Sequence, residues 1–240
     1  MARDFPEKNF SLSLEGYYKK SEQVINYKEG ASFLVFDDPS STREVSWEDN
    51  VTSGQSWSYG AEFLLQRKYG RFTGWIGYTL SWTEQQFDEL NGGNRFYARF
   101  DRRHDVSLVG IFKKSERVTF SGTWVYGTGN NFTLPTAQYR PFYDSRGGSI
   151  FFSDRYINYY DERNNFRAES YHRLDLSVQL HKQKKRGIRT WEFSLYNSYS
   201  RKNPFYYYTD TRYLGNSEEG VLKRITLFPI LPSVTYKFQF

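Results

Sequence analysis

The sequence predicts an all-β protein, and specifically an antiparallel up-and-down transmembrane β-barrel of about eight strands. Three observations predict it. Apolar and polar residues alternate with a period of two, the connections alternate between short and long, and aromatic residues make up 20% of a chain whose mean hydropathy is −0.77. A chain this aromatic and this hydrophilic cannot build a thick aliphatic core, so its apolar side chains must lie thinly along one face of each strand.

The first half of the chain predicts four strands. The first is expected at 10–18 and the second at 59–65. The third, at 71–82, alternates most regularly, because its even positions are apolar, aromatic or Gly and its odd positions are mostly polar. The fourth is expected at 106–112. The longer of these segments reach the roughly 9–11 tilted residues that a bilayer-crossing strand needs.

The second half predicts four more strands, at 117–126, 172–182, 191–199 and 233–240. The last of them, "SVTYKFQF", carries aromatic side chains on one face and ends on an aromatic residue. A barrel strand that ends at a membrane interface is expected to have this composition, because aromatic girdles lie there.

The connections separate the two ends of the predicted barrel. Short turns at one end and long loops at the other are typical of outer-membrane barrels, whose periplasmic turns are short. Counting strands forward from the first turn places the last residue at the periplasmic interface. The short connections are 66–71, 113–117 and 181–189, and the long ones are about 27–56, 84–101, 129–170 and 201–220.

Three stretches carry a family resemblance. "YGAEFLLQRKYGRFTGWIGYTLSWTEQQF" and "DRRHDVSLVGIFKKSERVTFSGTWVYGTGNNFTLP" resemble the late barrel strands of TonB-dependent outer-membrane receptors. The ending "LKRITLFPILPSVTYKFQF" is similar to the terminal strand of that family. The resemblance implies a segment of a larger 22-stranded barrel in the outer membrane of a Gram-negative bacterium. It also implies a recognition signal for the barrel-assembly machinery at Tyr236, Phe238 and Phe240.

The family has a plug domain that fills the barrel, and nothing plug-like is present in 1–240. We therefore expect a single partial barrel domain, the C-terminal fragment of a receptor, that contributes to nutrient uptake and is not active alone. The solute expected from the resemblance is a glycan, a siderophore or a peptide. The expected partners are outer-membrane lipid, lipopolysaccharide, the assembly machinery, and the missing plug and N-terminal strands.

Two alternatives stay open at this point. A self-standing eight-stranded barrel with a binding or structural role requires the first strand to pair with the last. It also requires a charged interior, for which the candidates are Glu62, Arg71, Asp105, Arg173, Asp175 and Glu192. The other alternative is a soluble β-sandwich that acts as a binding module.

The residues give little support to catalysis or cofactor binding. His104 and His172 each stand near an aspartate, but no nucleophile can be selected among the many serines, so we expect no enzyme. The chain has no cysteine, no HxxxH and no calcium-loop spacing, so we expect no metal and no cofactor. A net charge of +6 without a long basic block predicts no nucleic-acid binding.

The best candidate for ligand binding is the long loop 129–170, which combines Tyr and Arg side chains. Aromatic faces and planar guanidinium groups suit sugar rings and acidic groups. A second aromatic run at 203–215 is expected at the same outer end, so the two segments are predicted to form one surface. The candidate ligand-binding residues are Tyr139, Arg140, Tyr143, Arg155, Tyr159 and Tyr160.

Overall fold

A computed structural model describes residues 1–31, 47–139, 142–145, 149–152, 157–214 and 217–240. In the first half the elements are β1 Ala2–Phe5, η1 Pro6–Lys8, β2 Phe10–Tyr27, η2 Glu48–Asn50, β3 Val51–Arg67, β4 Phe72–Gln86, η3 Asn91–Gly93, β5 Phe96–Tyr97, β6 His104–Ser115 and β7 Val118–Gly127. In the second half they are β8 Asn131–Phe132, β9 Ala137–Tyr139, β10 Phe142–Ser145, β11 Ser149–Phe152, β12 Ile157–Tyr159, β13 Phe166–Arg167, β14 Tyr171–Lys184, β15 Gly187–Tyr196, β16 Pro204–Leu214, β17 Ser217–Thr226 and β18 Leu231–Gln239.

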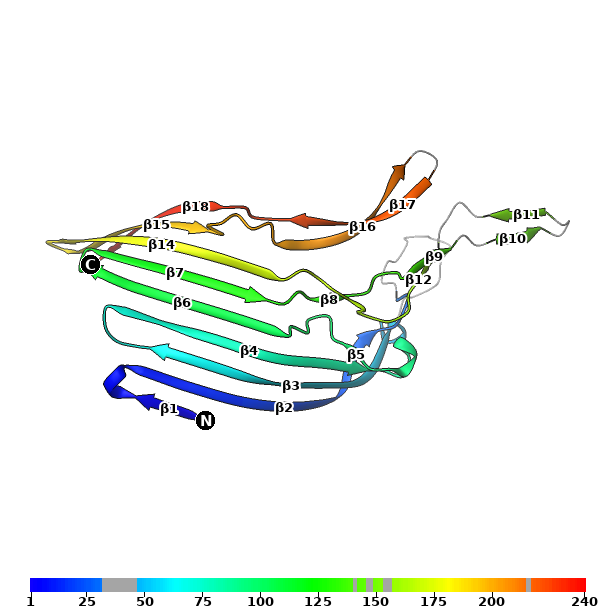
Figure 1. The fold of residues 1–240 in the computed structure, drawn as a ribbon, viewed down its shortest axis with the longest axis horizontal. Helices are drawn as coiled ribbons and strands as arrows, with labels where there is room; N and C mark the ends of the chain where they lie inside the picture. The colour runs from blue at the N-terminus through cyan, green and yellow to red at the C-terminus, as the bar shows by residue number, and fades with distance from the viewer. Residues whose placement is uncertain (32–46, 140–141, 146–148, 153–156, 215–216) are drawn as a thin grey trace.

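One large antiparallel sheet dominates the fold, and its strand order is β1-β2-β3-β4-β6-β7-β14-β15-β18, with β5 paired to β4 (Figure 1). Each strand of this sheet therefore lies beside the next strand of the same sheet along the chain, as an up-and-down fold requires. The prediction of an all-β chain with about eight long antiparallel strands is confirmed. None of the described residues belong to a helix long and apolar enough to cross a membrane.

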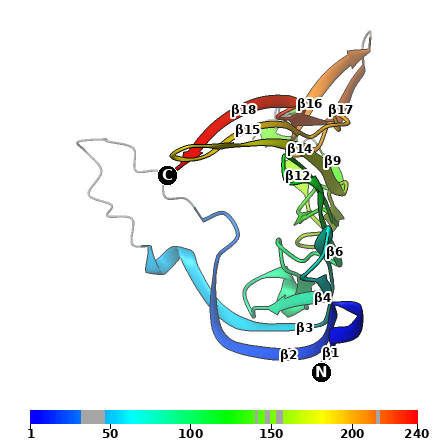
Figure 2. The ribbon, with the colours of Figure 1, turned by 90° about the vertical axis from the view of Figure 1, so that its left-hand side faces the viewer.

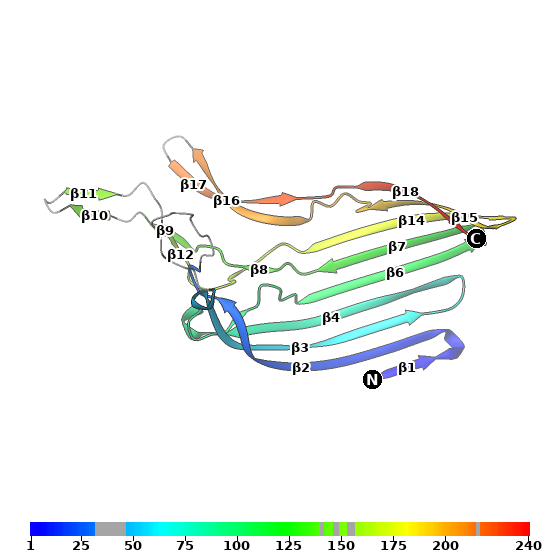
Figure 3. The ribbon, with the colours of Figure 1, turned by 180° about the vertical axis from the view of Figure 1, so that it is seen from behind.

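The predicted difference between the two ends of the sheet is also confirmed. The turns β3–β4, β6–β7 and β14–β15 lie at one end, together with η1 and the C-terminus, and the long connections lie at the other (Figures 1 and 3). We call these the turn end and the loop end.

Two of the predicted loop boundaries are wrong. Loop 27–56 begins where predicted, since β2 ends at Tyr27, but it ends earlier, because β3 begins at Val51. The upper part of β2 carries polar residues on both faces and a register shift between Ser21 and Val24, so it shows no alternation to predict a strand. Most of loop 201–220 belongs to the hairpin β16–β17, which extends beyond the main sheet and whose first strand is rich in Tyr and Thr (Figures 1 and 3).

The sheet is curved and open (Figure 2). β1 and β18 form its two edges, and among the described residues β18 pairs only with β15. The first-to-last pairing that a self-closed eight-stranded ring requires is therefore not present in the described part of the chain. A second sheet facing the first, as in a sandwich, is not present there either, since the remaining sheets are two-stranded.

Candidate functional site

The register of the large sheet joins the apolar residues of separate strands into a continuous band. Leu12, Leu65, Ile76 and Leu108 are consecutive cross-strand partners in the first half. In the second half, Val178 stands opposite Phe193, which stands opposite Val234. Many of these side chains are exposed, among them Ile76 at 42% and Val234 at 60%. Within the described residues, the face that the sequence predicts to be apolar is therefore partly or fully exposed along the sheet.

Aromatic rings border this band at both ends. At the loop end, Tyr59 stands between Tyr18 and Trp82, and the Tyr59 and Trp82 rings are stacked with centroids 5.5 Å apart. At the turn end, Phe72, Phe112 and Phe120 are cross-strand partners. Ten residues separate Phe72 from Trp82 along β4, which is about 33 Å of strand and about 25 Å of height at the tilt of a barrel strand. That height matches the apolar band of outer-membrane barrels.

The amount of exposed surface supports the same conclusion. The accessible surface is 18146 Å² for a mass of 28.6 kDa, whereas a globular monomer of that mass exposes about 11,000 Å². Only Trp57, Phe87, Leu90, Phe96 and Ala98 are buried hydrophobic residues in the described ranges. The described sheet therefore buries little apolar surface of its own.

The opposite face of the sheet carries hydrogen-bonded polar side chains. Ser121 and Ser177 hydroxyls lie 2.7 Å apart, and those of Ser194 and Ser233 lie 2.6 Å apart. Because Ser177 is the register partner of Ser194, the four hydroxyls form one row across four strands. Such a face suits contact with water better than contact with lipid.

Charged residues on this polar face pair in part as the sequence predicts. Arg173 Nε lies 2.9 Å from Asp175 Oδ2, which joins two of the predicted interior charges. Glu192 instead pairs with Lys237 on β18, at 2.9 Å, and also accepts a hydrogen bond from Gln179. Lys237 was not among the predicted residues, although its alternation with Tyr236 and Phe238 places it on this face.

The three histidines lie apart, each beside a hydroxyl group. His104 Nδ1 is 2.9 Å from the Tyr78 hydroxyl, and His172 Nδ1 is 2.7 Å from the Tyr199 hydroxyl. His181 lies between two threonines of the neighbouring strands. Among the described residues there is no group of three or more His, Asp or Glu side chains arranged to hold a metal ion.

The buried carboxylate of Asp101 joins two of the long connecting segments at the loop end. The side chain of Asp101 is 0% exposed and forms ion pairs with Arg103 and Arg167. Its Oδ1 also accepts a hydrogen bond of 2.7 Å from the Thr83 backbone N–H. Arg167 donates further to the carbonyl oxygens of Asp101 and Gly129. Asp101 therefore ties β4 and the 87–103 segment to the long connection between β7 and β14.

Another contact at the loop end spans most of the chain. The guanidinium group of Arg163 donates to Asn26 Oδ1 on β2 at 3.3 Å, and its backbone N–H donates to Asn91 Oδ1 at 2.8 Å. Burial lowers the pKa of Arg163, and the negative charge of Glu29 partly opposes that shift. The connection between β7 and β14 thus extends at the loop end as far as β2, which is near the opposite edge of the sheet.

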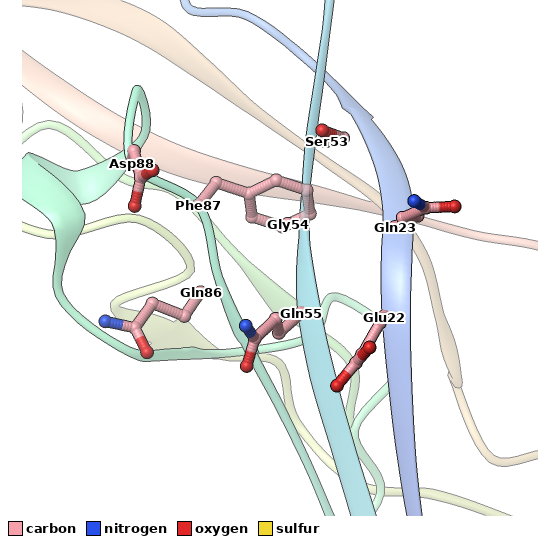
Figure 4. Close-up of a pocket in the computed structure, with 8 residues that line it drawn as sticks. All are labelled: Glu22, Gln23, Ser53, Gly54, Gln55, Gln86, Phe87 and Asp88. Carbon is pink, nitrogen blue, oxygen red and sulfur yellow. The ribbon is translucent and has the colours of Figure 1, made fainter.

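A cavity of about 480 Å³ lies at the loop end, between β2, β3 and the segment that follows β4 (Figure 4). The Phe87 ring lies against Gly54, where a Cβ atom would come within 2.4 Å of it (Figure 4). The Gln23 side chain points away from Gln55 and Gln86 (Figure 4). The residues with carboxylate or amide side chains at this cavity are Glu22, Gln23, Gln55, Gln86 and Asp88.

The predicted ligand-binding residues are brought together only in part. Tyr139 on β9 and Tyr159 on β12 lie on the same face of a two-stranded ribbon, since their register partners are Ile157 and Ala137. Tyr139, Tyr159 and Tyr160 are all half-exposed, at 53%, 54% and 50%.

The remaining predicted loop residues have no described side chain. Arg140 and Arg155 lie outside the described residues. Tyr143 belongs to β10, where its backbone pairs with Phe151, and its side chain is outside the described part of the structure.

The predicted meeting of the two aromatic segments is confirmed, but at other residues than those proposed. Phe132 stacks on Tyr207 with ring centroids 5.1 Å apart, and the Glu169 backbone N–H donates to the Tyr207 hydroxyl at 3.2 Å. Glu169 also pairs with Arg224 on β17. Between these segments lies a cavity of about 280 Å³, the rim pocket, lined by parts of 99–102, 128–132, 168–171 and 204–207.

The predicted assembly residues lie on the exposed apolar face of β18. Tyr236 packs against Trp191 of β15, with ring centroids 4.9 Å apart, and Phe238 lies 6.3 Å from Phe240. Their exposed fractions are 52% for Tyr236, 41% for Phe238 and 98% for Phe240. These rings extend the aromatic border of the turn end to the last residue of the chain.

Comparisons with known proteins found no match. The chain matches no family model, no curated protein and no solved structure.

Proposed function

We propose that this chain forms part of the wall of an outer-membrane β-barrel. The observation that carries the proposal is an uncovered apolar band, bordered by aromatic rings at both ends, on an up-and-down antiparallel sheet. A lipid bilayer covers such a band without a second protein layer. The hydrogen-bonded polar face then lines a water-filled interior, and the loop end faces the outside of the cell.

The barrel in this proposal is that of a TonB-dependent receptor that takes up a small solute. The resemblance of the strand sequences supports this choice, and so does the open sheet. Among the described residues this nine-stranded sheet has two unpaired edges, which are expected to take further strands as partners in a bilayer, because unpaired backbone groups are costly in lipid. The remaining strands of a 22-stranded barrel would pair with both edges, and a plug would fill the interior.

A test of the lipid-facing surface uses the absence of cysteine from the chain. Single cysteines at Leu176, Ser177, Val178 and Gln179, each carrying a nitroxide, are introduced into the protein in lipid vesicles. Accessibility to oxygen is expected to be high at the two apolar positions. Accessibility to a water-soluble nickel complex is expected to be high at the two polar ones, because successive side chains of a strand face opposite sides. An accessibility that does not alternate along β14 would contradict a membrane-spanning sheet.

A second test separates a wall segment from a self-closed barrel. Glu15→Cys on β2 and Thr235→Cys on β18 are combined in one chain and treated with a short bis-maleimide. We expect no cross-link within the chain, because β2 and β18 belong to opposite edges of the sheet. The matched control combines Ser177→Cys with Ser194→Cys, which are register partners and should cross-link fully. An intrachain cross-link between β2 and β18 as efficient as the control would favour the eight-stranded ring.

A further inference from the structure

We propose that the rim pocket binds a carboxylated sugar ring, as found at the end of an acidic glycan. The inference rests on the proposed function, because it assigns a solute class to the outward-facing end of the barrel wall. It is carried by three properties of the pocket: its size, its arginines, and its aromatic rings.

The size of the pocket favours a single ring. Its volume of about 280 Å³ lies just below the range of roughly 300–1,000 Å³ that is typical of small-molecule sites. One sugar unit fits such a space, and the rest of a glycan would extend into solvent above the loop end.

The charge of the pocket favours an acidic group. Arg99 is exposed, and within the described residues its guanidinium group has no ion-pair partner. Arg102 donates through Nε to Asn130 Oδ1 at 3.3 Å, and its Nη1 lies 3.6 Å from Asp105 Oδ2, too far for a short charged hydrogen bond. The acid in the pocket wall, Glu169, is paired with Arg224. The Arg99 guanidinium group is therefore available to a carboxylate, which it can bind through two parallel hydrogen bonds, while Arg102, which pairs with Asp105, also lines the pocket.

The lining of the pocket also includes tyrosine rings, whose tips are polar. Tyr206 is 56% exposed, and Tyr207 is held between the Phe132 ring and the Glu169 backbone N–H. The hydroxyl of Tyr171 accepts a hydrogen bond of 3.0 Å from Arg173. Rings of this kind offer an apolar face to the C–H groups of a sugar and a hydroxyl to its OH groups.

The walls of the pocket are tied together before any ligand binds. The Ala168 backbone N–H donates to the Asn130 carbonyl at 2.9 Å, and the buried side chain of Asn131 donates to the Ala98 carbonyl at 3.1 Å. At Gly129 a Cβ atom would lie 2.0 Å from the Ala168 carbonyl oxygen, so the two segments are in close backbone contact. A preformed pocket loses less conformational entropy on binding than a mobile loop does.

The test is calorimetric titration of the whole chain, refolded in detergent micelles, with trigalacturonate and with neutral galactotriose. The parent protein is expected to bind the acidic trimer about tenfold more tightly than the neutral one. Arg99→Gln combined with Arg102→Gln is expected to remove that preference. Arg95→Gln is the matched control, because Arg95 is also about half-exposed, at 55%, but lies outside the pocket, over the Trp57 ring. The Arg95→Gln variant should keep the preference of the parent protein for the acidic trimer.

Several outcomes would overturn the inference. These are equal affinity for the two trimers, an unchanged preference in the double variant, or an equal loss in Arg95→Gln. Displacement of trigalacturonate by an equal concentration of inorganic phosphate would also overturn it, since the pocket would then be a general anion site. The binding test could fail while nitroxide accessibility still alternates along β14. That result would reject the ligand and leave the barrel-wall proposal intact.

Discussion

Leu176→Arg is expected to destabilise the protein in a lipid bilayer by about 2–4 kcal/mol. Leu176 lies in the middle of β14, faces the exposed apolar side and is 43% exposed. Its register partners are Gly122 and Leu195, neither of which offers a charge or a hydrogen bond to a guanidinium group. The change is measured as the shift in the urea unfolding midpoint in phosphatidylcholine vesicles, followed by tryptophan fluorescence.

The control for that variant is Gln179→Arg on the same strand. Gln179 lies on the polar face and donates to the Glu192 carboxylate, so an arginine there keeps a partner and remains in contact with water. Its loss of stability should stay below about 1 kcal/mol. Equal losses for the two variants, or a larger loss at Gln179, would mean that the apolar face does not contact lipid.

Asp101→Ala is expected to weaken the loop end by about 3 kcal/mol. The variant leaves Arg103 and Arg167, which are only 19% and 28% exposed, without the carboxylate that they share. It also removes the acceptor of the Thr83 backbone N–H. A pair of this kind costs more to break than an exposed one because the remaining charges stay partly buried.

The effect of Asp101→Ala is measured by amide hydrogen exchange. Protection at the amides of Ala98, Asn131 and Ala168 should fall by about a hundredfold, while protection in the middle of β14 changes little. The control is Asp88→Ala, an exposed acid in the same connection. A similar fall in protection for Asp88→Ala would show that the loop end does not depend on the buried carboxylate.

The sequence predicts the large sheet well because a strand with one apolar and one polar face has to alternate. All eight long strands and the three short turns follow from period-two patterns, and Lys237 on the polar face follows from the same rule. The upper part of β2 and the hairpin β16–β17 were missed, because their residues do not follow a regular apolar and polar alternation. The pairing of these strands depends on partner strands that a local sequence pattern does not reveal.

The site was less predictable than the sheet. "DRRHD" indicates charge at the outer rim, but nothing in the sequence shows that Asp101 is buried between two arginines from different connections. The rim pocket depends on residues at 99, 102, 171 and 207, which are brought together by strand order. Composition correctly suggested aromatic and arginine side chains at this end, and pairing across the sheet decided which of them meet.

The short length of β1 has a consequence for isolated chains. β1 covers only the turn end of β2, so beyond Leu14 that strand has an open hydrogen-bonding edge within the described residues, and β18 has another. β2 and β18 run in opposite directions, so the edge of one chain is complementary to the opposite edge of a second chain. Contacts of this head-to-tail kind close into rings or continue as filaments. Isolated chains are therefore expected to associate with one another through these two edges.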